Sequence, residues 1–129
     1  MIGYAMLGTN DLAKARAFYA PLVAMLGGAE HPVEAPHRRT FYAKGGGPPM
    51  LAITEPVDGA LATVGNGSML ALPVATRAEV DALHAKALEL GAADEGAPGV
   101  RGQSDPAFYG AYFRDLDGNK LCIYHMGPR

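Results

Sequence analysis

Apolar runs and stretches of helical periodicity alternate along the chain, and the same order of elements occurs twice. In the first half, an apolar run at 2–8 predicts a buried strand, and apolar residues recur at helical spacing over 12–26. Pro21 is expected to bend or shorten this helix. Three extended segments are then predicted, at 29–34, 39–44 and 50–54.

The second half repeats this order with a clearer helix start. After an apolar run at 69–74, Thr76 and Glu79 have the spacing of a capping box, and the predicted helix continues to about residue 90. Three extended segments follow, at 92–96, 108–114 and 120–125. A tight turn at 115–119 between the last two predicts a hairpin. Both halves therefore share the order strand–helix–strand–strand–strand.

The composition fits a single folded domain of 129 residues, because 49% of the residues are hydrophobic and 19% are charged. Within this domain we place module 1 at 1–55 and module 2 at 68–129. The segment 56–67 is predicted to be a linker, since proline, glycine and asparagine interrupt the pattern there.

Charge and the length of the apolar runs exclude two classes of partner. The chain has 11 Lys and Arg against 13 Asp and Glu, and it lacks the basic stripe that nucleic-acid binding needs. No apolar run approaches the roughly 18 residues of a membrane span, so no membrane partner is expected. The absence of a signal-peptide pattern, with Cys122 as the single cysteine, favours a cytoplasmic protein without intrachain disulfides.

Three short segments carry a resemblance to a known family. They are residues 7–12 (Leu-Gly-Thr-Asn-Asp-Leu), 17–19 (Ala-Phe-Tyr) and 113–121 (Phe-Arg-Asp-Leu-Asp-Gly-Asn-Lys-Leu). The chain resembles the vicinal oxygen chelate superfamily, whose hairpin reads aromatic-x-Asp-Pro-Asp-Gly-Asn; Leu116 stands where proline is usual. The superfamily includes glyoxalase I, bleomycin resistance proteins and extradiol dioxygenases. The resemblance implies an α+β fold, with two βαβββ modules forming an open, barrel-like cup, and a homodimer.

The resemblance also assigns the positions of the family's metal ligands. They fall on Tyr4, Ala52, Met69 and Cys122. Alanine has no donor atom, a thioether is soft and neutral, and phenol and thiol both lose their protons well above pH 7. We therefore expect no metal and no other cofactor at this site.

Alternation of side chains along a strand predicts which residues line the cup. They are Tyr4 and Met6; Met50, Ala52 and Thr54; Met69 and Ala71; and Cys122 and Tyr124. Methionine-rich walls suit an adaptable pocket for a small apolar or partly aromatic molecule. The alternative is that these side chains simply fill the core.

Other polar and aromatic residues have two interpretations each. Arg101, in a predicted glycine-flanked loop, could bind a carboxylate or phosphate or lie in solvent, and Arg38 and Arg39 share this ambiguity. Cys122 could be a nucleophile or a buried, inert thiol, and His125 is expected on the opposite face. Alternation should place Phe108 with Tyr112, and Tyr109 with Phe113, on opposite faces of one strand.

The sequence is compatible with three functions. The first is a metal-free protein that binds a small molecule for sequestration or sensing, with Tyr4, Met6, Met50, Ala52, Met69, Cys122, Tyr124 and Arg101 as its binding residues. The second is a divergent glyoxalase-I-like lyase or isomerase whose metal is held by other ligands. The third is a scaffold with a filled cup. Whether the protein is an enzyme is left open.

Overall fold

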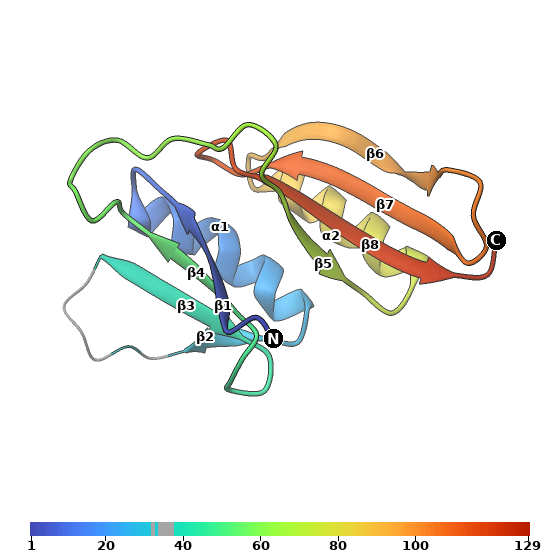
Figure 1. Cartoon of the computed structure of the whole chain (residues 1–129), viewed down its shortest axis with the longest axis horizontal. Helices are drawn as coiled ribbons and strands as arrows, with labels where there is room; N and C mark the ends of the chain where they lie inside the picture. The colour runs from blue at the N-terminus through green and yellow to red at the C-terminus, as the bar shows by residue number, and fades with distance from the viewer. Residues whose placement is uncertain (32, 34–37) are drawn as a thin grey trace. The chain divides into compact units, whose positions relative to one another are not determined.

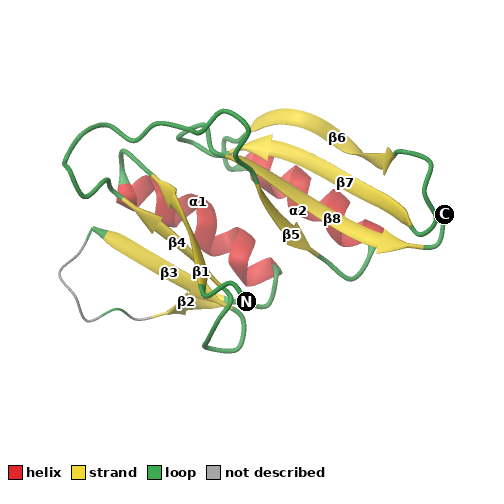
Figure 2. Ribbon diagram, in the orientation of Figure 1, coloured by secondary structure: helices red, strands yellow, loops and turns green. Residues whose placement is uncertain are grey.

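A computed structural model describes residues 1–31, 33 and 38–129, and these form two units, Met1–Gly65 and Asn66–Arg129. Each unit contains one helix and one four-stranded sheet (Figures 1 and 2). The elements of unit 1 are β1 (Tyr4–Gly8), α1 (Leu12–Met25), β2 (Ala29–His31), β3 (Arg39–Ala43) and β4 (Met50–Thr54). Those of unit 2 are β5 (Leu70–Pro73), α2 (Arg77–Glu89), β6 (Ala93–Arg101), β7 (Ala107–Arg114) and β8 (Lys120–Gly127).

The sheet of unit 1 has the strand order β1-β4-β3-β2, with β1 and β4 parallel and the other pairs antiparallel. Helix α1 begins after Asp11, whose side chain accepts a hydrogen bond from the Lys14 amide. The helix packs on one face of the sheet, where Tyr19 contacts Tyr42 of β3. Pro21 lies inside this helix, which continues to Met25, so of the two effects predicted for it, bending or shortening, the shortening does not occur.

The sheet of unit 2 has the equivalent order β5-β8-β7-β6, with β5 and β8 parallel. The predicted capping box of α2 is confirmed, because the side chains of Thr76 and Glu79 each accept a hydrogen bond from the other's backbone amide. The helix packs on one face of this sheet, where His84 meets Asp94 of β6 with Nε2 and Oδ1 3.1 Å apart. The predicted α+β fold of two βαβββ modules is confirmed.

The hairpin between β7 and β8 is also confirmed, and a buried carboxylate organises its turn. Asp115 Oδ1 accepts hydrogen bonds from the amides of Asp117 and Asn119, both at 2.9 Å. The side-chain amide of Asn119 donates to Asp115 Oδ2, also at 2.9 Å. Gly118 has a φ of 90°, a conformation that glycine adopts without strain.

Strand β6 differs most from its predicted range. Strand β6 continues to Arg101, so the predicted loop around Pro98 and Gly99 is wrong. Register shifts on both sides of Gly96 let the bulged strand keep its pairing with β7 despite the proline. Strand β2 ends at His31, and residues 32 and 34 of the predicted segment lie outside the described residues. Among the described helices, none combines the length and apolar character needed to cross a membrane.

Candidate functional site

In unit 1, strand register separates the side chains under α1 from those on the other face, which we call the open face of unit 1. Glu30 and Tyr42 are register partners on the helix side, since Glu30 pairs with Arg16 of α1. Side chains alternate between the two faces along each strand. Tyr4, Met6, Met50 and Ala52 alternate with the helix-side residues and therefore lie together on the open face. The sequence predicted all four for the wall of the cup, together with Thr54, which has the same parity on β4.

An aromatic pair covers the centre of the open face of unit 1. The rings of Tyr4 and Phe41 meet edge to face, with centroids 5.3 Å apart, although their strands are separated by β4. Ala52 is the register partner of Phe41 on β4, and its side chain is fully buried. A methyl group at this position leaves room for the two rings to meet, whereas a longer side chain would separate them. Sequence reasoning missed Phe41, because the wall was predicted from the segments at 2–8 and 50–54 and not from the segment at 39–44.

The open face of unit 2 is defined in the same way, by the faces of β7 and β8 that lie away from α2. Phe108 and Tyr124 stack there, with centroids 5.1 Å apart and ring planes 10° apart. Gly110 is the register partner of Tyr124, and a β-carbon on it would overlap the Phe108 ring. Tyr109 donates a hydrogen bond to Asp81 of α2, on the helix side, so the predicted alternation along β7 is confirmed.

Cys122 lies on the open face of unit 2 and is completely buried. Burial raises the pKa of the Cys122 thiol, and a hydrogen bond with Tyr112 and the charges of Arg101 and Lys120 offset this only in part. Burial likewise raises the pKa of Tyr112. A neutral, inaccessible thiol favours the structural interpretation of Cys122 over the nucleophilic one. His125, on the opposite face, places Nδ1 3.1 Å from the carbonyl oxygen of Val74.

Arg101 is at the end of β6 and not in the predicted loop, and its guanidinium is held along its own strand. Nη1 donates to the carbonyl of Gly99 at 2.9 Å, and Nη2 donates to that of Ala97 at 2.7 Å. The guanidinium carbon also lies 5.4 Å from the centroid of the Tyr112 ring. These contacts occupy donors that a bound anion would need.

The structure thus brings the predicted binding residues together in two separate groups. Tyr4, Met6, Met50 and Ala52 share the open face of unit 1. Cys122, Tyr124 and Arg101 belong to unit 2, together with Met69, an exposed residue immediately before β5. Neither group has a set of metal donors, because Ala52 has no donor atom and the Cys122 thiol is buried with a raised pKa. Among the described residues, no three His, Cys, Asp or Glu side chains gather into a metal-binding group.

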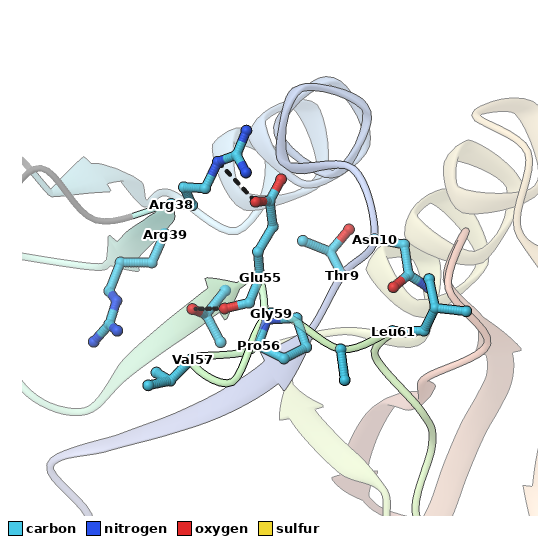
Figure 3. A pocket seen from close by; sticks show the side chains of 11 residues that line it. Thr9, Asn10, Arg38, Arg39, Glu55, Pro56, Val57, Gly59 and Leu61 are labelled. Carbon is cyan, nitrogen blue, oxygen red and sulfur yellow. Dashed lines mark hydrogen bonds and ion pairs between the residues drawn. The ribbon is translucent and has the colours of Figure 1, made fainter.

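A pocket of about 670 Å³ lies in unit 1, beyond the carboxyl ends of the parallel strands β1 and β4 (Figure 3). The described residues that line it are Thr9, Asn10, Arg38, Arg39, Thr54, Glu55, Pro56, Val57, Gly59, Ala60 and Leu61. The eight predicted binding residues are absent from this described lining. The segment after β4 returns to β1 because the Asn10 side chain accepts a hydrogen bond from the Ala62 amide at 2.7 Å.

The two arginines of the pocket have different surroundings. Arg38 Nε pairs with Glu55 Oε2 at 2.9 Å, and Figure 3 shows these side chains pointing toward each other. The Arg39 side chain points away from that pair, and its Nε is buried without a hydrogen-bond partner in the described structure. The sequence signal for this pocket was the Arg38-Arg39 pair, whose role the sequence left open.

Comparison with known proteins identifies the family. The family model described as "Glyoxalase-like domain" matches residues 4–124. A glyoxalase/bleomycin resistance protein from Albidiferax ferrireducens T118 is 38% identical, with 97% of this chain and 98% of that chain covered and a TM-score of 0.84. A hypothetical protein from S. aureus is 28% identical over 97% and 92% of the two chains, with a TM-score of 0.69.

A more distant structure agrees in fold. The lactoylglutathione lyase from Agrobacterium tumefaciens is 22% identical, with 97% and 92% of the chains covered and a TM-score of 0.66. No curated protein matches the chain. The family match over nearly the whole chain agrees with the two βαβββ units and with the resemblance carried by the sequence. The chain belongs to the glyoxalase-like domain family of the vicinal oxygen chelate superfamily.

Proposed function

We propose that this protein binds a small apolar or partly aromatic molecule without using a metal, and that it acts by sequestering or sensing that molecule. The observation that carries the proposal is the exposed apolar surface on the open face of unit 1. Tyr4 is 53% exposed and Met6 is 40% exposed, on the side of the sheet that α1 does not cover. Large apolar side chains that stay exposed side by side mark binding surfaces.

The chemistry of this surface supports an adaptable apolar site. The rings of Tyr4 and Phe41 meet edge to face, and this arrangement leaves aromatic surface on which a ligand can stack. Met6 and Met50 add flexible, polarisable side chains that adjust to ligand shape. In unit 2, the Phe108–Tyr124 stack and the exposed Met69 supply the same kinds of contact.

The donor set at the family's metal positions supports the metal-free part of the proposal. The methyl group of Ala52 is enclosed at a position that carries a ligand in metal-dependent relatives, according to the resemblance. A lyase or isomerase of the glyoxalase type needs a Lewis acid to stabilise the charge that develops on its substrate oxygens. That alternative would require ligands from outside these positions. The homodimer expected from the family is a further part of the proposal.

A fluorescence titration with N-phenyl-1-naphthylamine, an uncharged aromatic probe, tests the proposal. In the presence of a chelator, we expect saturable binding to the intact chain that is weakened about tenfold in Met6→Glu, because a buried charge replaces an apolar contact. Met25→Glu is the matched control, since Met25 is 45% exposed on α1 and away from the open face.

Equal affinity in Met6→Glu and Met25→Glu would exclude the open face as the binding surface. Metal-dependent conversion of a hemithioacetal by the intact protein would instead favour the lyase. Failure to bind the probe, together with unchanged stability in Met6→Glu, would favour the scaffold.

A further inference from the structure

The pocket of unit 1 contains a cation whose charge is not paired within the described residues. Arg38 is engaged with Glu55 through a 2.9 Å contact. Arg39 forms no ion pair with any described residue, and its buried Nε has no hydrogen-bond partner among them. The guanidinium of Arg39 therefore offers a positive charge and an unused donor. A buried donor without a partner is costly unless a ligand supplies the acceptor.

The other polar side chains of the described lining are occupied. Thr9 Oγ1 donates to the Asp11 carbonyl at 3.1 Å, and Thr54 Oγ1 donates to the Glu55 carbonyl at 2.8 Å. Asn10 is bound to the Ala62 backbone. Two arginines against one glutamate give the described lining a formal charge of +1. The pocket therefore offers one unneutralised positive charge, located on Arg39.

The described lining also includes large apolar side chains. Val57 is 87% exposed and Leu61 is 80% exposed, and both belong to the segment that follows β4. Large exposed apolar side chains in the same pocket as a partly buried arginine with an unpaired Nε suit a ligand that has an anionic group on an apolar body. The volume of about 670 Å³ is within the range of small-molecule pockets.

We infer that this pocket binds a small organic carboxylate. One carboxylate oxygen accepts a hydrogen bond from Arg39 Nε, and the apolar body of the ligand lies against Val57 and Leu61. A singly charged carboxylate matches the single net charge of the described lining. The described lining contains none of the eight residues that the sequence assigned to binding, and of the predicted wall it contains only Thr54.

Isothermal titration calorimetry of the intact chain with 4-phenylbutyrate at low ionic strength tests this assignment. The neutral control ligand is 4-phenyl-1-butanol, which has the same apolar body. We expect Arg39→Gln to weaken binding of the carboxylate at least about tenfold, because it removes a charge-assisted hydrogen bond. Binding of the alcohol should be unchanged. Lys14→Gln, the same charge change on α1 outside the described lining, should alter neither.

A second pair of variants tests the site even if Arg39→Gln impairs folding. Val57→Asp places a negative charge on a solvent-exposed side chain at the pocket, and we expect it to weaken carboxylate binding several-fold. Val64→Asp makes the same change at an exposed position outside the described lining, and it should have no effect.

Three results would overturn the assignment. These are unchanged affinity for 4-phenylbutyrate in Arg39→Gln and Val57→Asp, equally tight binding of the alcohol, and competition by inorganic phosphate at the concentration of the carboxylate. No heat of binding from 4-phenylbutyrate at millimolar concentration would also count against it. Arg39→Gln should leave the affinity for N-phenyl-1-naphthylamine unchanged, so this test can fail independently of the proposed function.

Discussion

The two units share one order of elements, yet the side chains on their open faces differ in how many of their hydrogen-bonding and packing partners lie within the protein. On unit 2, Arg101 donates to two carbonyls of its own strand, Tyr112 is hydrogen-bonded to Cys122, and aromatic rings stack over Gly110. On unit 1, Tyr4 and Met6 stay exposed and Arg39 lacks a partner for its Nε among the described residues. Two units of the same topology can therefore differ in chemistry. In one, the polar groups are hydrogen-bonded within the protein, and in the other, apolar side chains and a donor are left for a ligand.

This difference predicts that substitutions on the two open faces affect different quantities, the free energy of unfolding and the affinity for a ligand. Groups that are satisfied within the protein contribute to folding, whereas exposed apolar groups and unpaired donors are available to a ligand. We therefore expect substitutions in the centre of the open face of unit 2 to change mainly the free energy of unfolding. Substitutions on unit 1 should change mainly affinity.

The largest expected effect is in the turn that joins β7 to β8. Asp115→Ala leaves three donors in this turn without their acceptor, and we expect the free energy of unfolding to fall by about 3 kcal/mol. Urea unfolding followed by circular dichroism measures the change. Asp115→Asn keeps the shape and should have a smaller effect. An equal loss in both variants would mean that the charge of the carboxylate, and not its hydrogen-bond geometry, stabilises the turn.

Met69 tests whether the exposed edge of unit 2 behaves like unit 1. Because Met69 is exposed, Met69→Glu should leave the free energy of unfolding unchanged, while affinity for N-phenyl-1-naphthylamine falls about tenfold. Fluorescence titration and urea unfolding on the same samples give both quantities. Unchanged affinity would remove Met69 from the binding surface and confine ligand contacts to unit 1.

Arg101 and Arg39 give the sharpest contrast between the two faces. Arg101→Gln loses two hydrogen bonds to strand carbonyls, so we expect the free energy of unfolding to fall by about 1 kcal/mol. Its affinity for 4-phenylbutyrate should equal that of the unmodified chain by calorimetry. A large loss of affinity with no change in stability would contradict a structural role for Arg101 and would support the carboxylate-binding role predicted from the sequence.

The smallest effect is the pH dependence contributed by Cys122. Because burial raises the pKa of this thiol above its ordinary value of 9.0, the folded protein holds the proton more tightly than the unfolded chain. Stability from this group is present below pH 9 and is lost as the pH rises above it. The slope of unfolding free energy against pH, measured between pH 8.5 and 10, should be shallower in Cys122→Ser. Rapid alkylation of the folded protein at pH 8 would contradict the burial of the thiol.

Much of the fold follows from local patterns in the sequence. The capping box at Thr76, the Asp115 turn and the two rounds of apolar periodicity are local signals, and the structure confirms each. Alternation along strands placed Tyr4 and Ala52 on one face because strand geometry fixes that parity. The path of β6 was missed, since Pro98 and Gly99 are typical of loops and only the bulges allow the strand to continue.

The pocket depends on contacts that local patterns do not encode. Its described lining includes the segment assigned to a linker, which returns to β1 through the hydrogen bond between Asn10 and Ala62, 52 positions apart. Likewise, nothing in the sequence distinguishes Arg101 from Arg39. Their different roles depend on which acceptors the folded strands bring within reach.

The central claim is that the protein binds its ligand without a metal, and a native mass spectrum tests it most directly. The protein is purified without added metal or chelator and sprayed under non-denaturing conditions. The account predicts the mass of the bare assembly, or that mass plus an organic adduct whose mass indicates the ligand class. One zinc, nickel or iron ion bound per site would contradict the claim and make the metal-dependent lyase the better explanation.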